Sequence, residues 1–236
     1  MQRWGADAIK FMRDASEYNV FNEELITEIQ DFLPADGHIC DAGCGLGYLS
    51  EQLAKVCKTV TAVDLSEPAI SFAKKRHRSE NLEFLCCDIE TLSEQFDAMV
   101  FCYFGRTNEI LQISRKLCLG NVVIVKRNCS EHRFSLQEVS RKHTVDDTSA
   151  FLTQYGIPFY KKKISLELGQ PFRSVEDAVR FFQQYDKSNS IIHADMILPR
   201  LQKIEHPEYR FYLPEKRSME LIVFRATDIP KDGFDG

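Results

Sequence analysis

The 236-residue sequence contains no long apolar run, because no stretch approaches the roughly 18 consecutive apolar residues that span a bilayer. The N-terminal segment also lacks the apolar stretch of a secretory signal, since Gly5, Asp7 and Lys10 interrupt its apolar residues. These absences argue against a membrane partner and against secretion. We therefore expect a cytoplasmic protein.

An excess of positive charge is absent as well, because the formal net charge is −5. Proteins that hold long RNA or DNA usually carry a net basic surface. The two basic runs, Lys74–Arg78 and Lys161–Lys163, each fit a solvated face of a helix or strand better than a phosphate track. Nucleic acid is therefore disfavoured as a partner.

Cysteine spacings typical of metal sites are also missing. All eight cysteines lie within the first 129 residues, and most fall in expected strands or on helix faces, where cytosolic thiols are usually small buried apolar groups. Cys40 and Cys44 have Gly47 where the third cysteine of an iron–sulfur triplet would stand. The pair Cys86 and Cys87 has no partner cluster at ligand spacing. We therefore expect no metal site.

The stretch that organises the chain is His38–Ser50, where a short apolar run is followed by alternate glycines and then by a helical pattern. Glycine is required where the backbone takes a positive φ or where a ligand approaches without a Cβ in the way. The first N–H groups of the following helix face whatever lies over the turn. The pattern Asp-x-Gly-x-Gly-x-Gly differs from the G-x-G-x-x-G of dinucleotide sites, and it lacks the lysine of a P-loop.

This pattern resembles motif I of the class I S-adenosylmethionine-dependent methyltransferases. The resemblance implies S-adenosyl-L-methionine as the cofactor. It also implies that the turn containing Gly43, Gly45 and Gly47 passes under the methionine end of the cofactor, with Asp41 near its amino group.

Acidic residues also end the next two expected strands, at Asp64 and Asp88. An acid at the end of the second strand is placed to bind ribose hydroxyls in nucleotide-binding folds of this type. By the resemblance, Asp64 holds the ribose and Asp88 holds the adenine amino group. Leu65 and Ile89 are expected to flank the adenine ring.

The fourth strand is expected to end at Cys102, beside the transferable methyl group, since open α/β sheets bind ligands at the carboxyl ends of their strands. We therefore include Cys102 among the cofactor-binding residues, and Tyr103 and Arg106 become candidates for acceptor binding. The exit lacks the Asn/Asp-Pro-Pro-Tyr/Phe motif of nitrogen methylases and the acids of magnesium-dependent catechol-type enzymes. The catalytic residue is left unassigned.

Two further acceptor-binding candidates lie elsewhere in the chain. Tyr18 follows the first expected helix, and in similar small-molecule methyltransferases an N-terminal helix folds over the cofactor. His132 lies in a polar stretch after the fifth strand. An ordinary packed aromatic residue and a histidine without a catalytic role are the alternatives.

The spacing of apolar residues predicts an α/β fold, with a doubly wound seven-stranded sheet that is mostly parallel and has an antiparallel last strand. The expected strands are 38–41, 58–64, 82–87, 95–102, 121–126, 159–168 and 218–224. Helices are expected at about 6–15, at about 22–32 with Asn22 as N-cap, and at about 191–204.

We expect a single domain over residues 1–236, with an N-terminal helical lid at 1–37 and a cofactor-binding core at 38–127. Residues 169–216 form an insertion between the last two strands, with a helix expected after Ser174. This insertion is a cap over the acceptor site or a dimerisation surface. We favour the cap because long insertions at a ligand-binding edge are often functional. The oligomeric state is left open.

The sequence thus predicts in-line methyl transfer from S-adenosylmethionine to a small-molecule acceptor, in which the protein aligns the nucleophile and keeps water out. A methylase of protein or tRNA is the alternative enzyme class. A cofactor-binding protein without its own chemistry is the alternative outside enzymes. An NAD-dependent oxidoreductase is disfavoured by the glycine spacing. The acceptor atom and the need for a general base stay open.

Overall fold

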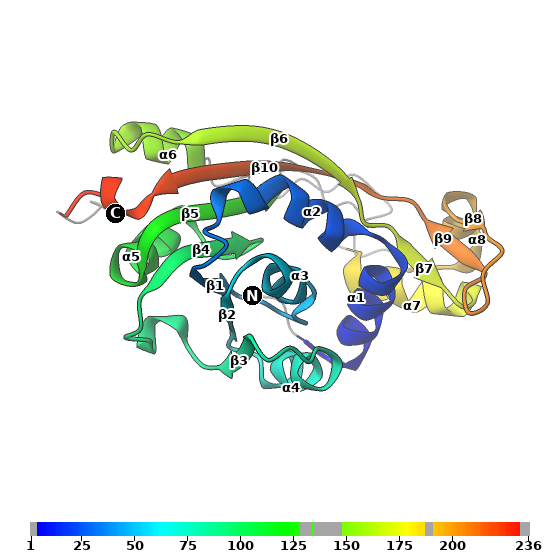
Figure 1. Cartoon of the computed structure of the whole chain (residues 1–236). Coiled ribbons are helices and arrows are strands. Elements are labelled where there is room, and N and C mark those ends of the chain that lie inside the picture. Colours follow the sequence, from blue (N-terminus) through cyan, green and yellow to red (C-terminus); the bar gives the residue numbers. More distant parts are fainter. Residues whose placement is uncertain (1–3, 128–133, 135–147, 187–190, 232–236) are drawn as a thin grey trace.

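The computed structural model describes residues 4–127, 134, 148–186 and 191–231, which contain a sheet covered by helices on both faces (Figure 1). The main sheet has seven strands in the order β3-β2-β1-β4-β5-β10-β6. The strands are β1 (His38–Ala42), β2 (Thr59–Asp64), β3 (Leu82–Cys86), β4 (Phe96–Cys102), β5 (Cys118–Arg127), β6 (Tyr160–Glu167) and β10 (Lys216–Arg225). Strand β10 runs antiparallel to the other six strands, which all have the same direction. The predicted fold class is therefore confirmed.

Successive strand residues are buried on opposite faces of the sheet. Ile39 and Val100 belong to one apolar core, and Cys40 and Phe101 belong to the other. Strands covered on both faces have this continuous apolar character. The covering helices are α2 (Phe21–Ile29), α3 (Tyr48–Val56) and α4 (Glu67–Arg76) on the first face, and α5 (Thr107–Leu117) and α6 (Thr148–Gln154) on the second.

The order of the strands reverses between β1 and β4, which are neighbours in the sheet. The connections through α3 and α4 build the sheet outward to β3, whereas the connection through α5 builds it in the opposite direction to β5. Ligands of open α/β sheets bind outside the carboxyl ends of the strands at such a switch. The fold therefore places a ligand site over the loops that follow β1 and β4.

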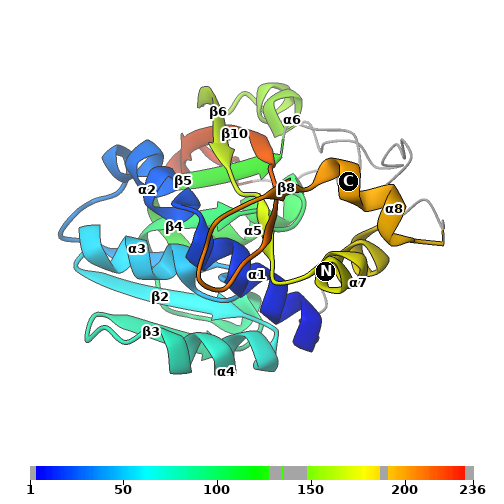
Figure 2. The same cartoon turned by 90° about the vertical axis from the view of Figure 1, so that its right-hand side faces the viewer.

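The insertion forms a small lobe at this same edge of the sheet. Because β10 is antiparallel to both β5 and β6, β6 runs in the direction of β5 and ends at the carboxyl edge. The lobe contains β7 (Gln170–Phe172), α7 (Val175–Tyr185), α8 (Ala194–Ile197), β8 (Gln202–Lys203) and β9 (Phe211–Leu213). Its strands pair in the order β7-β9-β8. Figures 1 and 2 show it beside α1 (Ala6–Tyr18).

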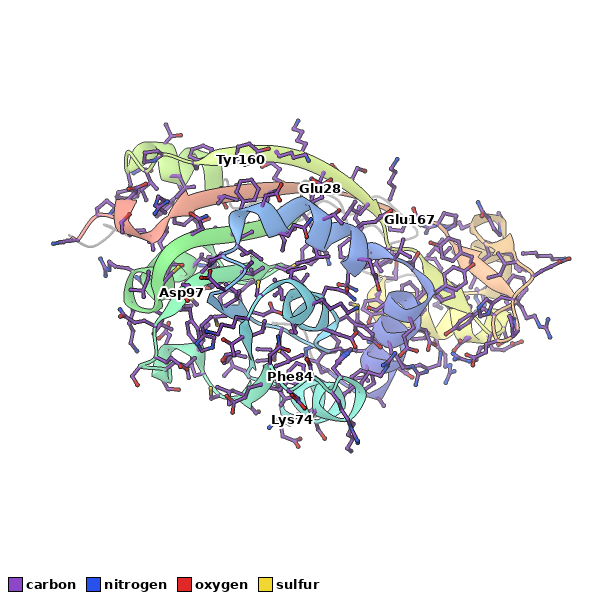
Figure 3. The ribbon with its side chains drawn as sticks, in the orientation of Figure 1. Glu28, Lys74, Phe84, Asp97, Tyr160 and Glu167 are labelled. Atoms are coloured by element: carbon purple, nitrogen blue, oxygen red, sulfur yellow. The ribbon has the colours of Figure 1, made fainter. Side chains whose placement is uncertain are left out.

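Glu167, at the end of β6, closes the base of this lobe (Figure 3). Its Oε1 accepts a hydrogen bond from Tyr212 Oη at 2.6 Å and another from the backbone N–H of Glu215 at 2.8 Å. Tyr212 Oη also lies 2.7 Å from Asn19 Oδ1, just after α1. One carboxylate therefore ties the start of the insertion to its end, and Tyr212 ties both to α1.

Helix α1 supplies part of the apolar core of the lobe. The ring of Phe11 is buried, and its centroid lies 5.2 Å from that of Phe181 in α7 and 6.3 Å from that of Phe172 in β7. The apolar face of α7 thus packs against α1 and the small sheet, so α1 is the platform on which the insertion rests.

A buried carboxylate reinforces this contact. Asp14 of α1 has no exposed surface, and it pairs with Arg173 of the insertion and with Arg13, whose Nη2 lies at 2.7 Å. Burial alone raises the pKa of Asp14, but hydrogen bonds from Arg173 and Arg13 outweigh it, so the pKa is lowered. Lys10 also pairs with Asp177 of α7 at 2.7 Å. The insertion is therefore held to α1 by charge as well as by apolar packing.

Two predicted helix boundaries were wrong. Helix α2 begins at Phe21, so Asn22 lies inside it and does not cap it. The helix expected at 191–204 is only α8 followed by a 3-10 turn, Leu198–Arg200, and then β8. Pro199 has no N–H to continue an α-helix, which explains the early stop.

Candidate functional site

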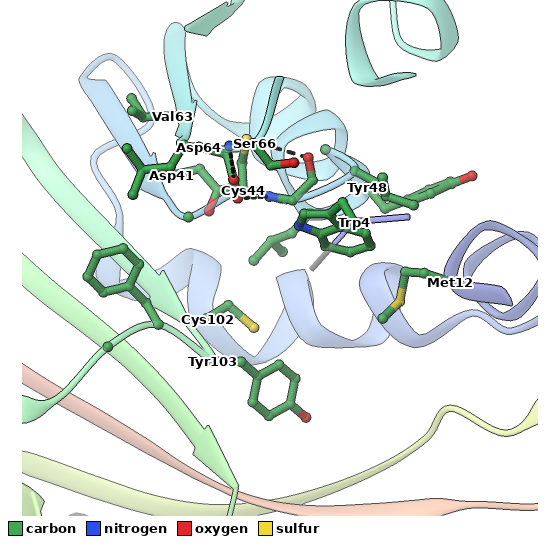
Figure 4. A pocket seen from close by; sticks show the side chains of 18 of the residues that line it. Trp4, Met12, Asp41, Cys44, Tyr48, Val63, Asp64, Ser66, Cys102 and Tyr103 are labelled. Atoms are coloured by element: carbon green, nitrogen blue, oxygen red, sulfur yellow. Dashed lines mark hydrogen bonds between the residues drawn. The ribbon is translucent and has the colours of Figure 1, made fainter. Parts of the chain in front are cut away.

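A cavity of about 1050 Å³ opens at the carboxyl edge of the sheet, where the fold predicts a ligand site (Figure 4). Most of the residues that the sequence assigned to the cofactor or the acceptor lie on its wall. They are Asp41, Gly43, Gly45, Gly47, Asp64, Leu65, Asp88, Ile89, Cys102 and Tyr103. The structure therefore brings together residues from the ends of four successive strands.

Two glycines of the loop after β1 are required by what lies against them. Gly47 has a φ of +79° at the start of α3, and a Cβ there would lie 2.6 Å from the ring of Phe84. Gly45 has a φ of +54°, and a Cβ there would lie 2.8 Å from Cζ2 of Trp4. Side chains other than glycine rarely adopt such angles. Both positions therefore exclude a side chain, and we call this loop, which lines the cavity, the glycine cradle.

Asp64 fixes the loop from the neighbouring strand. Its Oδ2 accepts a hydrogen bond from the N–H of Gly45 at 2.9 Å, and its Oδ1 accepts one from the N–H of Ser66 at 2.8 Å. A carboxylate has about four acceptor positions. Two bonds to backbone N–H groups thus orient Asp64 and leave acceptor capacity for a pair of ligand hydroxyls.

Asp88 and the two apolar residues predicted to flank adenine lie beyond Asp64. Asp88 caps a short 3-10 turn, Ile89–Thr91, and its Oδ1 accepts from the N–H of Glu90 at 3.0 Å. Leu65 is 51% exposed although its side chain is large and apolar. An exposed leucine on a cavity wall that also includes the buried Ile89 is a natural contact for a flat apolar ring.

Asp41 lies at the inner end of the cavity with only 2% of its surface exposed. Burial raises the pKa of Asp41 to about 6, and the charge of Asp64 acts in the same direction, while a hydrogen bond from Ser50 Oγ at 2.5 Å opposes the shift. A buried carboxylate with a raised pKa favours a cation beside it. Asp41 is therefore suited to an ammonium group.

The opposite end of the cavity is built around the exit of β4, and Figure 4 shows Cys102 and Tyr103 across the space from Asp64. Tyr103 has a φ of +56°, an angle that costs energy in a residue with a Cβ and is found mostly at functional sites. Its N–H donates to the carbonyl of Val125 at 2.9 Å, which fixes the strained turn. The guanidinium carbon of Arg127 lies 4.9 Å from the centre of its ring.

Burial and, to a smaller extent, the charge of nearby Asp41 raise the pKa of Cys102 to about 12, while the charges of Arg217 and Arg127 act in the opposite direction. Cys102 is therefore a neutral thiol at physiological pH and lines the wall without acting as a nucleophile. Both guanidinium groups lie near enough to influence it, which places positive charge beside the β4 exit.

Three residues that line this cavity were not selected from the sequence, namely Trp4, Phe104 and Arg217. Trp4 precedes α1, whose Met12 and Ser16 also reach the wall. Glu17 attaches the same helix to the core, because its Oε1 accepts from Tyr48 Oη at 3.0 Å and from Arg76 Nε at 2.8 Å. Only the isolated position of the sole tryptophan could have drawn attention to this segment.

Three acceptor candidates from the sequence do not lie on the described wall. Tyr18 packs its ring against Tyr212, Tyr209 and His206, with centroid distances of 5.0, 5.7 and 5.5 Å, and so joins α1 to the insertion. Arg106 is exposed at the start of α5, where its N–H donates to Glu109 Oε2 at 2.9 Å. His132 lies outside the residues that the structure describes.

Comparison with known proteins identifies the fold and the cavity. A protein-family model described as a methyltransferase domain matches residues 34–193, which is more than half of the chain. The chain belongs to the S-adenosylmethionine-dependent methyltransferase family. Its cofactor is accordingly S-adenosyl-L-methionine, and the glycine cradle, the acids at the strand ends and the size of the cavity fit this molecule.

Among characterised relatives, the chain is 28% identical to the malonyl-[acyl-carrier protein] O-methyltransferase of Acetivibrio thermocellus over 58% of this chain and 56% of that protein. A protein of the same name from Bacillus cereus is 25% identical over 81% of this chain and 66% of its own length. The ubiquinone biosynthesis O-methyltransferase of Coxiella burnetii is 46% identical over only 59 residues. The chain thus spans between about half and two thirds of the length of the first two relatives.

Solved structures share the fold at low sequence identity. The YcgJ protein of Bacillus subtilis matches with a TM-score of 0.54 and 12% identity, over 86% of this chain and 97% of that one. Magnesium protoporphyrin IX methyltransferase from Synechocystis, solved with bound S-adenosylhomocysteine, matches with a TM-score of 0.50 and 14% identity, over 94% and 89% of the two chains. At these identities the comparison supports the fold alone.

Metal binding and membrane crossing can also be considered for the described part of the chain. Within these residues, no group of three or more histidine, cysteine, aspartate or glutamate side chains is arranged to hold a metal ion. Over the same ranges, no helix has the length and apolar character needed to cross a membrane.

Proposed function

We propose that the protein transfers the methyl group of S-adenosylmethionine to a small-molecule acceptor. The observation that carries this proposal is one continuous cavity that joins the acids at the strand ends to the space beside the β4 exit. Its volume of about 1050 Å³ is at the upper end of the roughly 300–1,000 Å³ typical of small-molecule sites. It is therefore large enough for the cofactor and a compact acceptor together.

The bound cofactor supplies an activated methyl group on a sulfonium. The residues of the chain supply position and exclusion of water, since in-line displacement depends on alignment of the nucleophile. Asp64 holds the ribose, the glycine cradle lies under the methionine part of the cofactor, and Asp41 lies where the cofactor's ammonium group is expected. Tyr103, held in its strained turn, then defines where the acceptor lies relative to the methyl group. Helix α1 lines the cavity through Met12 and Ser16, and the insertion that packs against α1 holds this part of the wall in place.

Other observations bear on the two alternatives, which are a methylase of protein or tRNA and a cofactor-binding protein without its own chemistry. The names of the relatives favour acceptors in which an oxygen is methylated, although these alignments cover only part of each protein. The net charge of −5 argues against a tRNA substrate. A protein without its own chemistry would bind the cofactor in the same cradle and transfer nothing.

The test is acceptor-dependent formation of S-adenosylhomocysteine by the purified full-length protein. Incubation with S-adenosylmethionine and a panel of small acids, phenols, alcohols and amines is expected to give the product with at least one acceptor. Asp64→Ala is expected to abolish it at low cofactor concentration, and Asp36→Ala, which removes an exposed carboxylate, serves as the matched control. Tight cofactor binding without product for any acceptor would contradict the enzymatic function.

A further inference from the structure

Arg217 lies where an acceptor would meet the methyl group. It is the second residue of β10, only 7% of its surface is exposed, and it lines the cavity together with Leu168, Phe21 and Tyr103. Its guanidinium carbon lies 5.8 Å from the centre of the Phe21 ring. Among the described residues of the wall, Arg217 carries the only cationic side chain.

The sheet order separates Arg217 from the cofactor acids. Asp41, Asp64 and Asp88 belong to the ends of β1, β2 and β3, whereas Arg217 lies on β10, beyond β4 and β5. Adjacent strands are about 4.8 Å apart, so β10 is about 14 Å from β1 and about 10 Å from β4 along the sheet. The cofactor occupies the β1–β3 side, and the methyl group faces the β4 exit. Arg217 is therefore on the far side of the methyl group.

A buried guanidinium in that place suits an acid. Arginine presents a planar fork of N–H donors that matches a carboxylate, and the apolar neighbours Phe21 and Leu168 strengthen this attraction by excluding water. A carboxylic acid is already deprotonated at neutral pH. Its methylation therefore requires charge and alignment, which Arg217 and Tyr103 provide, and requires no removal of a proton.

We propose that the acceptor carries a carboxylate, that Arg217 binds this group beside the β4 exit, and that the product is a methyl ester; this rests on the proposed function. A carboxylate oxygen forms a bond to the methyl carbon as the bond from carbon to sulfur breaks. The electron pair of that bond stays on sulfur, which becomes a neutral thioether. No proton is transferred, and no oxidant or metal is required.

One other carboxylate could reach Arg217, namely that of the methionine part of the cofactor. The two sources give different results when Arg217 is changed. If the acceptor is bound, Arg217→Gln lowers kcat/KM for the acceptor about ten- to hundredfold, the scale of one lost hydrogen bond to a charged group. The affinity for S-adenosylhomocysteine, which keeps the cofactor's carboxylate, then stays within about twofold.

The experiment uses S-adenosylmethionine labelled in the methyl group and a panel of aliphatic and aromatic carboxylates, each paired with its primary amide and its alcohol. Methyl esters release methanol in alkali, so the label is expected to be volatile after base treatment and to come from carboxylates alone. Arg217→Lys keeps the charge without the fork and is expected to retain part of the rate. Arg225→Gln, at the exposed far end of the same strand, is the matched control.

Three outcomes would overturn the proposal. Label that is stable to alkali, on an amide or an alcohol of the panel, would support a methyltransferase but contradict the carboxylate acceptor. An equal loss of S-adenosylhomocysteine affinity in Arg217→Gln would assign the residue to the cofactor. Transfer to no panel member, with no carboxylate bound by the protein loaded with S-adenosylhomocysteine, would remove both the carboxylate and the proposed function.

Discussion

The close packing of Trp4 on Gly45 predicts the cost of adding a side chain at Gly45, because one distance and one backbone angle set its size. In Gly45→Ala the new methyl group would lie 2.8 Å from Trp4 Cζ2, whereas carbon atoms normally approach to about 3.5–4.0 Å. The indole must therefore retreat by about 1 Å. The φ of +54° adds a separate cost of about 1–2 kcal/mol in the free energy of unfolding, because a Cβ is disfavoured in that conformation.

These two costs can be separated by a control and a double mutant. Gly156 has a φ of +66° with no atom within 4 Å of the added Cβ, so Gly156→Ala measures the backbone cost alone. We expect Gly45→Ala to cost about 1 kcal/mol more than this control, and Trp4→Ala to remove that excess in the double mutant. A difference of this size shifts the Tm by about 2–4 °C in a chain of this length.

Thermal unfolding followed by circular dichroism measures these effects without relying on the tryptophan. The same residue reports cofactor binding, since Trp4 is the only tryptophan in the chain and lies on the cavity wall. Titration with S-adenosylmethionine is expected to change its fluorescence in the wild type, and Gly45→Ala is expected to weaken the affinity. Equal costs at Gly45 and Gly156, together with fluorescence that is indifferent to the cofactor, would refute the placement of Trp4.

Four further predictions test other parts of the site. Asp64→Ala should weaken S-adenosylmethionine binding by about 1.5–3 kcal/mol in calorimetry, and unchanged affinity in a folded variant would reject its ribose role. Because the pKa of Asp41 is raised to about 6, the protonated side chain contributes to stability fully below about pH 4, and this contribution is lost as the pH rises through 6. In Asp41→Asn, the free energy of unfolding measured between pH 4 and 8 should no longer show this fall with rising pH. Methyl transfer should survive EDTA, and activity restored only by added magnesium or zinc would reveal a metal requirement. Replacing residues 169–216 with a short turn should abolish methyl transfer. It should also weaken cofactor binding, because Phe11 and Asp14 of α1 lose their partners in the insertion. Full activity together with a change from dimer to monomer in light scattering would instead identify the segment as a subunit interface.

The sequence was sufficient to predict that the acids and glycines at the strand ends share one wall, because their positions depend on local patterns. Asp41, Asp64 and Asp88 each follow an apolar strand within a few residues, and parallel strands place their carboxyl ends at one edge. The glycines at positions 45 and 47 predict positive φ angles, and both residues have them in the structure. Once the strands are assigned, the geometry of these groups follows from the fold with little freedom.

The acceptor half could not be derived in this way because its parts are distant in the sequence. Tyr103, Phe21 and Arg217 come from three separate segments, and no spacing between them signals that they share a wall. Arg217 is the second residue of β10, in the part of the strand where buried and exposed residues alternate, so the sequence pattern does not distinguish it from an ordinary buried strand position. Tyr103 has a positive φ that its residue type does not predict, because such angles are expected mainly at glycine.

Helix α1 connects the two halves, which explains why neither is complete without the N-terminal segment. One side of this segment places Trp4 against the glycine loop and anchors Glu17 to Tyr48. The other side contributes Phe11 and Asp14 to the contact with the insertion. Because the N-terminal segment carries both sets of contacts, we expect substitutions that displace the insertion from α1 to disturb the wall of the cavity as well.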